Sequence, residues 1–96
     1  MVSLGTIRDQ RKTILQIAAR HGATNVRVFG SVARGQAGAG SDIDLLVRFD
    51  ADRSLVDHVA LVQDLQDALG CPVDVVNERA LHPRISQRVL AEAVQL

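Results

Sequence analysis

The pattern of hydrophobic and polar positions predicts a helix near the beginning of the chain and a strand after it. Apolar residues recur near helical spacing between residues 6 and 21. Thr6 and Asp9 resemble a capping box, and Gly22 is a residue type that commonly ends a helix. The short run from residue 26 to 29 favours a β-strand.

A glycine-containing segment, residues 30–40, separates this strand from the next one. It has the composition of a loop, with room for a helical turn near residues 32–34. The odd-numbered positions from Ile43 to Phe49 are then apolar, whereas Asp42 and Asp44 occupy even-numbered positions. Because side chains alternate along a strand, this segment predicts a strand with one apolar face and one face that bears carboxylates.

A second helix is predicted after this strand. Ser54 and Asp57 form another capping-box match, and Gly70 with Pro72 marks the end of the helical pattern. The apolar stripe that we expect to face the core consists of Leu55, Val59, Val62, Leu65 and Leu69.

A third strand and a last helix complete the predicted order. The β-favouring run from residue 73 to 76 carries Asp74. Pro83 suits the first turn of a helix, which we expect over residues 84–96. Its apolar positions include Ile85, Val89 and Ala93. The sequence therefore predicts one α+β domain over residues 1–96, with the order α, β, β, α, β, α.

Composition excludes several classes of function. The 11 basic and 11 acidic residues cancel, and only Phe29 and Phe49 are aromatic, which argues against a broad nucleic-acid surface. Cys71 is the only cysteine, so the chain forms no internal disulfide and has too few thiolates for a typical zinc site. Charged residues interrupt the segment 1–12, which therefore resembles neither a signal peptide nor a membrane span. We expect a cytoplasmic protein that does not bind membranes.

The predicted carboxylate face suggests a magnesium site. Asp42 and Asp44 lie two positions apart, so both side chains leave the same face of a strand and can bind one hard cation. Asp-x-Asp also occurs in solvated turns, but here it leads directly into an apolar strand. Asp74 either faces water on an edge strand or, if its strand lies beside that of Asp42, completes the site and accepts a proton.

The segment from Gly30 to Gly35 follows a strand and precedes these carboxylates. Glycine lets backbone N–H groups approach phosphates closely, and the Ser31 hydroxyl can donate a hydrogen bond to them. Arg34 either adds positive charge near the phosphates or forms a salt bridge with a loop carboxylate. The segment lacks the Lys-Ser or Lys-Thr of a P-loop, and a flexible connection is the alternative interpretation.

The combined motif resembles the signature of the DNA polymerase beta nucleotidyltransferase superfamily. It consists of Gly30-Ser31, ten intervening residues and then Asp42-Ile43-Asp44, and its surroundings are similar to the minimal prokaryotic members, the MNT proteins. The resemblance implies a small mixed sheet with helices packed on it. It also implies that Gly30 and Ser31 contact a triphosphate, that Asp42 and Asp44 hold Mg²⁺, and that Asp74 is the third acidic residue. We place Arg34 and Ser41 in the same nucleotide-binding set.

The resemblance implies nucleotidyl transfer from ATP or another nucleoside triphosphate. Minimal members often occur beside a helical HEPN protein, so the chain is expected to be an antitoxin that transfers AMP to a tyrosine of such a toxin. Two alternatives remain open: a small-molecule hydroxyl as acceptor, and an antitoxin that binds its partner without catalysis. Because the chain is short, we expect another subunit to contribute part of the site, either a partner protein or a second copy of the chain.

Overall fold

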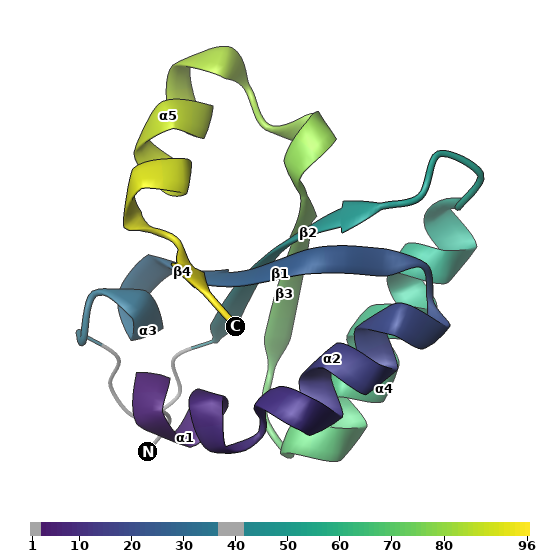
Figure 1. The fold of residues 1–96 in the computed structure, drawn as a ribbon, viewed down its shortest axis with the longest axis horizontal. Helices are drawn as coiled ribbons and strands as arrows, with labels where there is room; N and C mark the ends of the chain where they lie inside the picture. Colours follow the sequence, from purple (N-terminus) through teal and green to yellow (C-terminus); the bar gives the residue numbers. More distant parts are fainter. Residues whose placement is uncertain (1–2, 37–41) are drawn as a thin grey trace.

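The computed structural model describes residues 3–36 and 42–96, and within these ranges it contains a four-stranded mixed sheet (Figure 1). The strand order is β3-β2-β1-β4, in which β1 is antiparallel to β2 and β4, and β2 is parallel to β3. The strands are β1 Ala23–Phe29, β2 Ile43–Phe49, β3 Val73–Asn77 and β4 Val94–Gln95. The helices are α1 Leu4–Asp9, α2 Arg11–Arg20, α3 Gly30–Ala33, α4 Leu55–Leu69, the 3-10 helix η1 Glu78–Ala80 and α5 Pro83–Glu92. The expected α+β fold class is confirmed.

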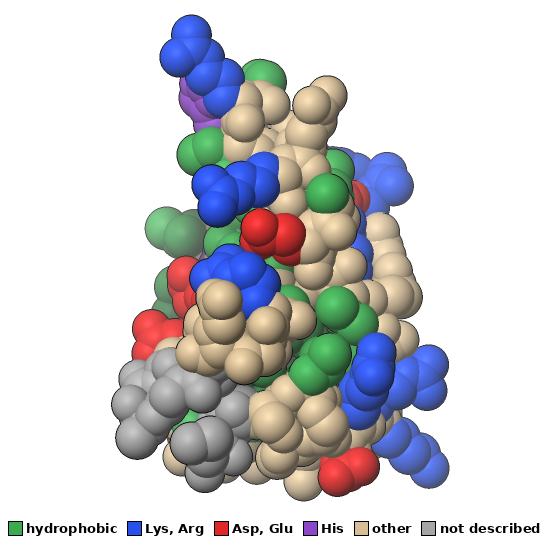
Figure 2. Space-filling model, turned by 90° about the vertical axis from the view of Figure 1, so that its left-hand side faces the viewer, with side chains coloured by type: hydrophobic (Ala, Val, Ile, Leu, Met, Phe, Trp, Pro, Cys, Tyr) green, Lys and Arg blue, Asp and Glu red, His purple; other side chains and the backbone are tan. Residues whose placement is uncertain are grey.

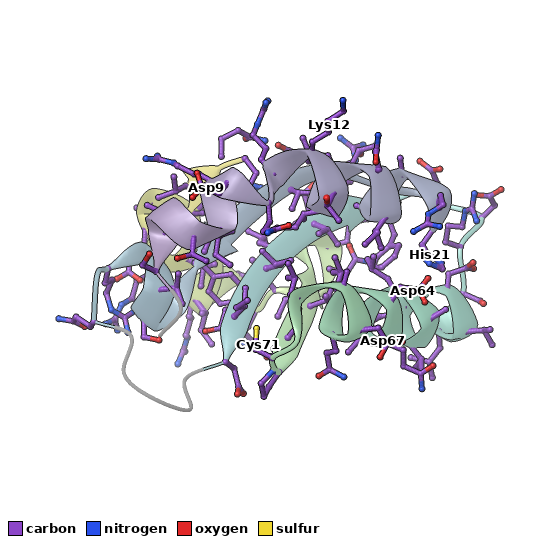
Figure 3. The ribbon with its side chains drawn as sticks, turned by 90° about the horizontal axis from the view of Figure 1, so that it is seen from below. Asp9, Lys12, His21, Asp64, Asp67 and Cys71 are labelled. Carbon is purple, nitrogen blue, oxygen red and sulfur yellow. The ribbon has the colours of Figure 1, made fainter. Side chains whose placement is uncertain are left out.

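One face of the sheet forms the main hydrophobic core. The odd-numbered side chains of β2 point to this face and are fully buried together with residues of α2 and α4. These helices lie side by side against the sheet (Figures 1 and 3). The predicted alternation in β2 is therefore confirmed, because burial of its apolar face fixes which side chains point away from the core.

The opposite face of the sheet carries the even-numbered side chains of β2. Leu46 is fully buried there, although it lies outside the core cluster. Helix α5 lies on this side, in contact with α3, and joins η1 to β4 (Figure 1). None of the residues in α5 is buried, so this helix is held mainly by contacts near its ends.

The first predicted helix is interrupted in the structure. Helix α1 ends at Asp9, Gln10 lies between the two segments, and α2 begins at Arg11. The proposed capping box of Thr6 and Asp9 was wrong. The cap is Ser3, whose hydroxyl accepts a hydrogen bond from the Thr6 backbone N–H at 3.2 Å.

The predicted position of the C-terminal end of the last helix was also wrong. Helix α5 stops at Glu92, and the following residues form β4, in which Val94 pairs with Val28. The backbone N–H of Leu96 then donates to the Val26 carbonyl at 3.0 Å, and the Leu96 side chain is buried. The chain end therefore protects the free edge of β1 instead of continuing the helix.

The capping box of α4 is confirmed, but its predicted apolar stripe is rotated. Ser54 and Asp57 exchange the expected hydrogen bonds, and Gly70 ends the helix in the left-handed conformation. Leu65 is buried, and Val62 and Leu69 pack against the core, as expected. Leu55 is 76% exposed and Val59 is 49% exposed, which was not expected. The deepest contact is made by Leu61, which the predicted stripe did not include.

The three histidines form hydrogen bonds within the fold, and Cys71 packs against the hydrophobic core. His21 pairs with Asp64 between α2 and α4, as Figure 3 shows. The histidine hydrogen bonds are His21 Nε2 to Asp64 Oδ2 at 2.6 Å, His58 Nε2 to the Val75 carbonyl at 2.8 Å, and the Arg84 N–H to His82 Nδ1 at 3.1 Å. Burial raises the pKa of the Cys71 thiol, which keeps it protonated. None of the helices within the described ranges has both the length and the apolar content that a membrane span requires.

The rotation of α4 gives a direct stability prediction. Leu61→Ala should lower the free energy of unfolding by about 3 kcal/mol, because it leaves a cavity in the core. Leu55→Ala is the matched control and should change it by less than about 0.5 kcal/mol, because Leu55 is exposed. Urea denaturation of both variants measures the difference. Equal losses would show that the two leucines are equally buried in solution.

Candidate active site

The register of β2 against β3 brings two carboxylates together. Asp44 and Asp74 are register partners on neighbouring parallel strands, and side chains at such positions leave the same face of the sheet. Asp42 immediately precedes β2 and is exposed, as is Asp74, whereas Asp44 is half-buried. The expectation that the Asp74 strand lies beside the Asp42–Asp44 segment is confirmed. Asp74 also lies on an edge strand, so water reaches it.

Gly30 allows the glycine segment to approach Asp44 closely. Phe29 is the register partner of Asp44 in the antiparallel pair of β1 and β2, and α3 begins at the next residue, Gly30. Gly30 has a φ of +72°, and a Cβ atom at this position would overlap Oδ2 of Asp44. Position 30 therefore needs glycine for two reasons: the backbone conformation is one that other residues rarely adopt, and the Asp44 carboxylate fills the space of a side chain.

The surroundings of Asp44 disfavour its negative charge. Burial raises the pKa of Asp44 most, and the neighbouring carboxylates of Asp74 and Asp42 raise it further. The positive charge of Arg34 acts in the opposite direction and lowers this pKa. The site thus concentrates oxygen ligands and negative charge beside one guanidinium, an arrangement that favours a bound cation.

Arg34 lies at the end of α3 and contacts the C-terminal end of α5. Its Nη1 donates to Glu92 Oε2 at 3.2 Å, and its Nε donates to Gln36 Oε1 at 3.1 Å. Of the two alternatives for Arg34, a salt bridge is present, but its partner is a carboxylate of helix α5 and not of a loop. Figure 2 shows basic and acidic side chains intermixed on this face of the molecule instead of a continuous basic surface.

Of the two remaining residues of the predicted site, Ser31 and Ser41, only Ser31 lies within the described ranges. Ser31 is the second residue of α3 and is half-buried next to Gly30. Ser41 lies outside the described residues. Within residues 3–36 and 42–96, no three or more His, Cys, Asp or Glu side chains form a group with the geometry of a metal site. The three aspartates are thus neighbours in the fold, but their carboxylates do not converge on a single metal position.

Sequence reasoning missed Glu92 as part of the site. On the sequence it forms an ordinary pair with Arg88 four residues earlier, which is typical of a solvated helix face. Its contact with Arg34 joins positions separated by 58 residues, so helical spacing carried no signal for it.

Comparisons with known proteins agree on one family. A family model described as a nucleotidyltransferase domain matches residues 10–96, a range that includes every residue of the site described above. The protein adenylyltransferase MntA of Thermococcus cleftensis is 38% identical over 79 residues, which are 82% of this chain and 80% of that protein. A solved structure of a candidate minimal nucleotidyltransferase has a TM-score of 0.89 at 52% identity, covering 99% of this chain and 97% of that one. A toxin–antitoxin crystal structure with AMP-PNP has a TM-score of 0.76 at 26% identity, covering 88% and 69%.

The two reasons for glycine at position 30 can be separated by comparison with Gly35, which has the same backbone conformation. Gly35 also has a φ of +72°, but a Cβ atom there would meet nothing within 4 Å. Gly35→Ala should lower the free energy of unfolding by about 1 kcal/mol, the cost of a left-handed alanine. Gly30→Ala should cost about 1–3 kcal/mol more, because Asp44 must move. Chemical denaturation of the two variants measures this difference, and equal costs would contradict the close approach.

The raised pKa of Asp44 predicts a stability gain when its charge is removed. A carboxyl group with a folded pKa above its unfolded value favours the folded state when protonated, so stability falls as the pH rises from about 3.8 through the folded pKa. Asp44→Asn should therefore raise the free energy of unfolding at pH 7 without metal, by about 0.5 kcal/mol. The gain should shrink at pH 3. The exposed Asp67 on α4 gives the control Asp67→Asn, and a loss of stability in Asp44→Asn alone would contradict the prediction.

Proposed function

Because the chain belongs to the nucleotidyltransferase domain family, we propose that it uses Mg²⁺ and ATP to transfer AMP to a tyrosine of a HEPN-type helical toxin. The observation that carries this proposal is the register of Asp44 against Asp74, with Asp42 two residues earlier and Gly30-Ser31 beside them. We place the reaction in the cytoplasm, where ATP is available.

The residues of the site fit magnesium. Mg²⁺ takes oxygen ligands, and one or two carboxylates are enough because water and substrate phosphates complete its octahedron. Asp42 and Asp44 supply such carboxylates, and a cation would offset the burial and the neighbouring negative charges that raise the pKa of Asp44. When bound, the ion would orient the phosphates and stabilise the charge that develops on their oxygens.

The residues of the chain have separate tasks in the proposed reaction. The backbone at Gly30 and the Ser31 hydroxyl bind the triphosphate, and the Arg34 guanidinium offsets its negative charge. A tyrosine oxygen attacks the α-phosphorus, the bond from that phosphorus to the bridging oxygen of the β-phosphate breaks, and pyrophosphate leaves. Asp74, which water and an acceptor can reach, takes the proton from the tyrosine hydroxyl.

Two observations favour a protein acceptor. The relative named MntA is a protein adenylyltransferase, and a structural neighbour is a toxin–antitoxin pair with AMP-PNP. In this chain, α5 leaves Ile85 and Leu90 about half exposed, whereas Val89 and Ala93 are partly covered. A helical partner could cover these exposed apolar side chains and bring its tyrosine to Asp74.

We predict that Asp42→Asn and Asp44→Asn abolish AMP transfer without unfolding the protein. The chain would be co-expressed with the product of its neighbouring gene, and the intact mass of that product measured after addition of ATP and Mg²⁺. The wild type should add one or more AMP units at tyrosine.

Asp74→Asn should keep most of its affinity for AMP-PNP and lose transfer, because a general base contributes little to binding.

The alternatives give different results in this experiment. Full transfer by Asp42→Asn would reject the metal assignment. A toxin that stays unmodified yet is inhibited equally by the wild type and by Asp42→Asn would identify a binding antitoxin. Transfer to a small hydroxyl compound, with no toxin bound, would identify a small-molecule acceptor.

A further inference from the structure

Glu92 is the last residue of α5, and its carboxylate joins two arginines. Oε2 accepts a hydrogen bond from Nη1 of Arg34 at 3.2 Å, and Oε1 lies 3.5 Å from Nε of Arg88. The Glu92 side chain is 30% exposed and that of Arg34 is 42% exposed, whereas that of Arg88 is 82% exposed. The contact with Arg34 is therefore the more protected of the two.

The helix itself gives little reason for a carboxylate at position 92. The C-terminal end of a helix carries partial negative charge, so an acidic side chain in the last turn is electrostatically unfavourable. The pair with Arg88 also has the weaker order, because glutamate stabilises a helix better when it precedes its basic partner. The position of Glu92 is better explained by its contact with the glycine segment than by the stability of α5.

Arg34 needs such a contact to stay near the site. Its helix α3 has four residues, and an arginine side chain is long and flexible enough to lose much conformational entropy when it is fixed. Glu92 binds Nη1 and Gln36 binds Nε. The Arg34 backbone N–H donates to the Gly30 carbonyl at 3.1 Å, and Gly30 lies against the Asp44 carboxylate. A guanidinium carries five N–H donors, so a phosphate oxygen can bind Arg34 without displacing Glu92.

We propose that Glu92 is a positioning residue that holds the Arg34 guanidinium at the triphosphate-binding side of Asp44. This inference rests on the proposed function, in that it takes ATP as the ligand of the site. Glu92 does not touch the nucleotide. It acts through Arg34, and the last turn of α5 thereby becomes part of the nucleotide site.

The experiment measures the affinity for AMP-PNP with Mg²⁺ by titration calorimetry. Glu92→Ala should raise Kd about threefold to tenfold, because Arg34 loses the acceptor oxygen that holds its Nη1. Glu92→Gln keeps an acceptor oxygen and should recover most of the affinity. Arg88→Ala is the matched control, since Arg88 contacts the same carboxylate from the exposed side, and it should change Kd less than about twofold.

A double-mutant cycle separates positioning from a general structural effect. Arg34→Ala should weaken AMP-PNP binding, and Arg34→Ala with Glu92→Ala should be no weaker than Arg34→Ala alone. In the transfer assay, Glu92→Ala should raise KM for ATP and leave kcat nearly unchanged. Thermal melts of each variant should show that the protein remains folded.

Two results would overturn the role of Glu92. One is an unchanged or tighter Kd for Glu92→Ala while Arg34→Ala is weakened, and the other is a fully additive double mutant. The proposed function fails separately, if the wild type binds AMP-PNP with the predicted dependence on Glu92 but transfers no AMP to the toxin.

Discussion

The register between β2 and β3 is the constraint on which the active site depends, and the hydrophobic core sets it. On the core face, Ile43 pairs with Val73 and Leu45 pairs with Val75, and all four side chains are buried. A shift of one residue in β3 would turn its two core valines out to the opposite face and bring Asp74 into the core. The burial that stabilises the fold thus also holds Asp74 opposite Asp44. No polar contact between the carboxylates is needed to bring them together.

This arrangement places like charges side by side, which lowers stability and prepares the site for a cation. The cost is limited because Asp42 and Asp74 remain exposed, where water screens their charge. Asp44 is less exposed and has the raised pKa. Gly30 adds to the constraint, since any side chain there would occupy the space of the Asp44 carboxylate. Local features that reduce stability therefore occur together at the residues to which we assign chemistry.

Predictions of helices, strands and their buried faces from the sequence were most accurate where the local pattern and the tertiary packing agree. The alternation after Asp42 identified both faces of β2, because the direction of a side chain follows its parity in a strand. Ser54 and Asp57 identified the start of α4, because a capping box is a contact between residues close in sequence. The same pattern did not determine which side of α4 faces the sheet, since Leu55 and Leu61 are equally apolar. Their burial depends on where β2 and β3 lie, which periodicity does not encode.

The C-terminal segment shows why the rest of the site could not be predicted. Pro83 and the spacing of apolar residues correctly indicated α5, but none of its residues is buried, so its own apolar pattern does not fix its position. Two contacts are made at its C-terminal end. There Glu92 pairs with Arg34, and Val94 pairs with Val28 in a strand of two residues. A strand this short has no recognisable alternation, and a salt bridge between distant positions has no sequence spacing. The same two contacts connect the last helix to β1 and to the glycine segment, so the part of the chain that was hardest to predict is also the part that links α5 to the carboxylate site.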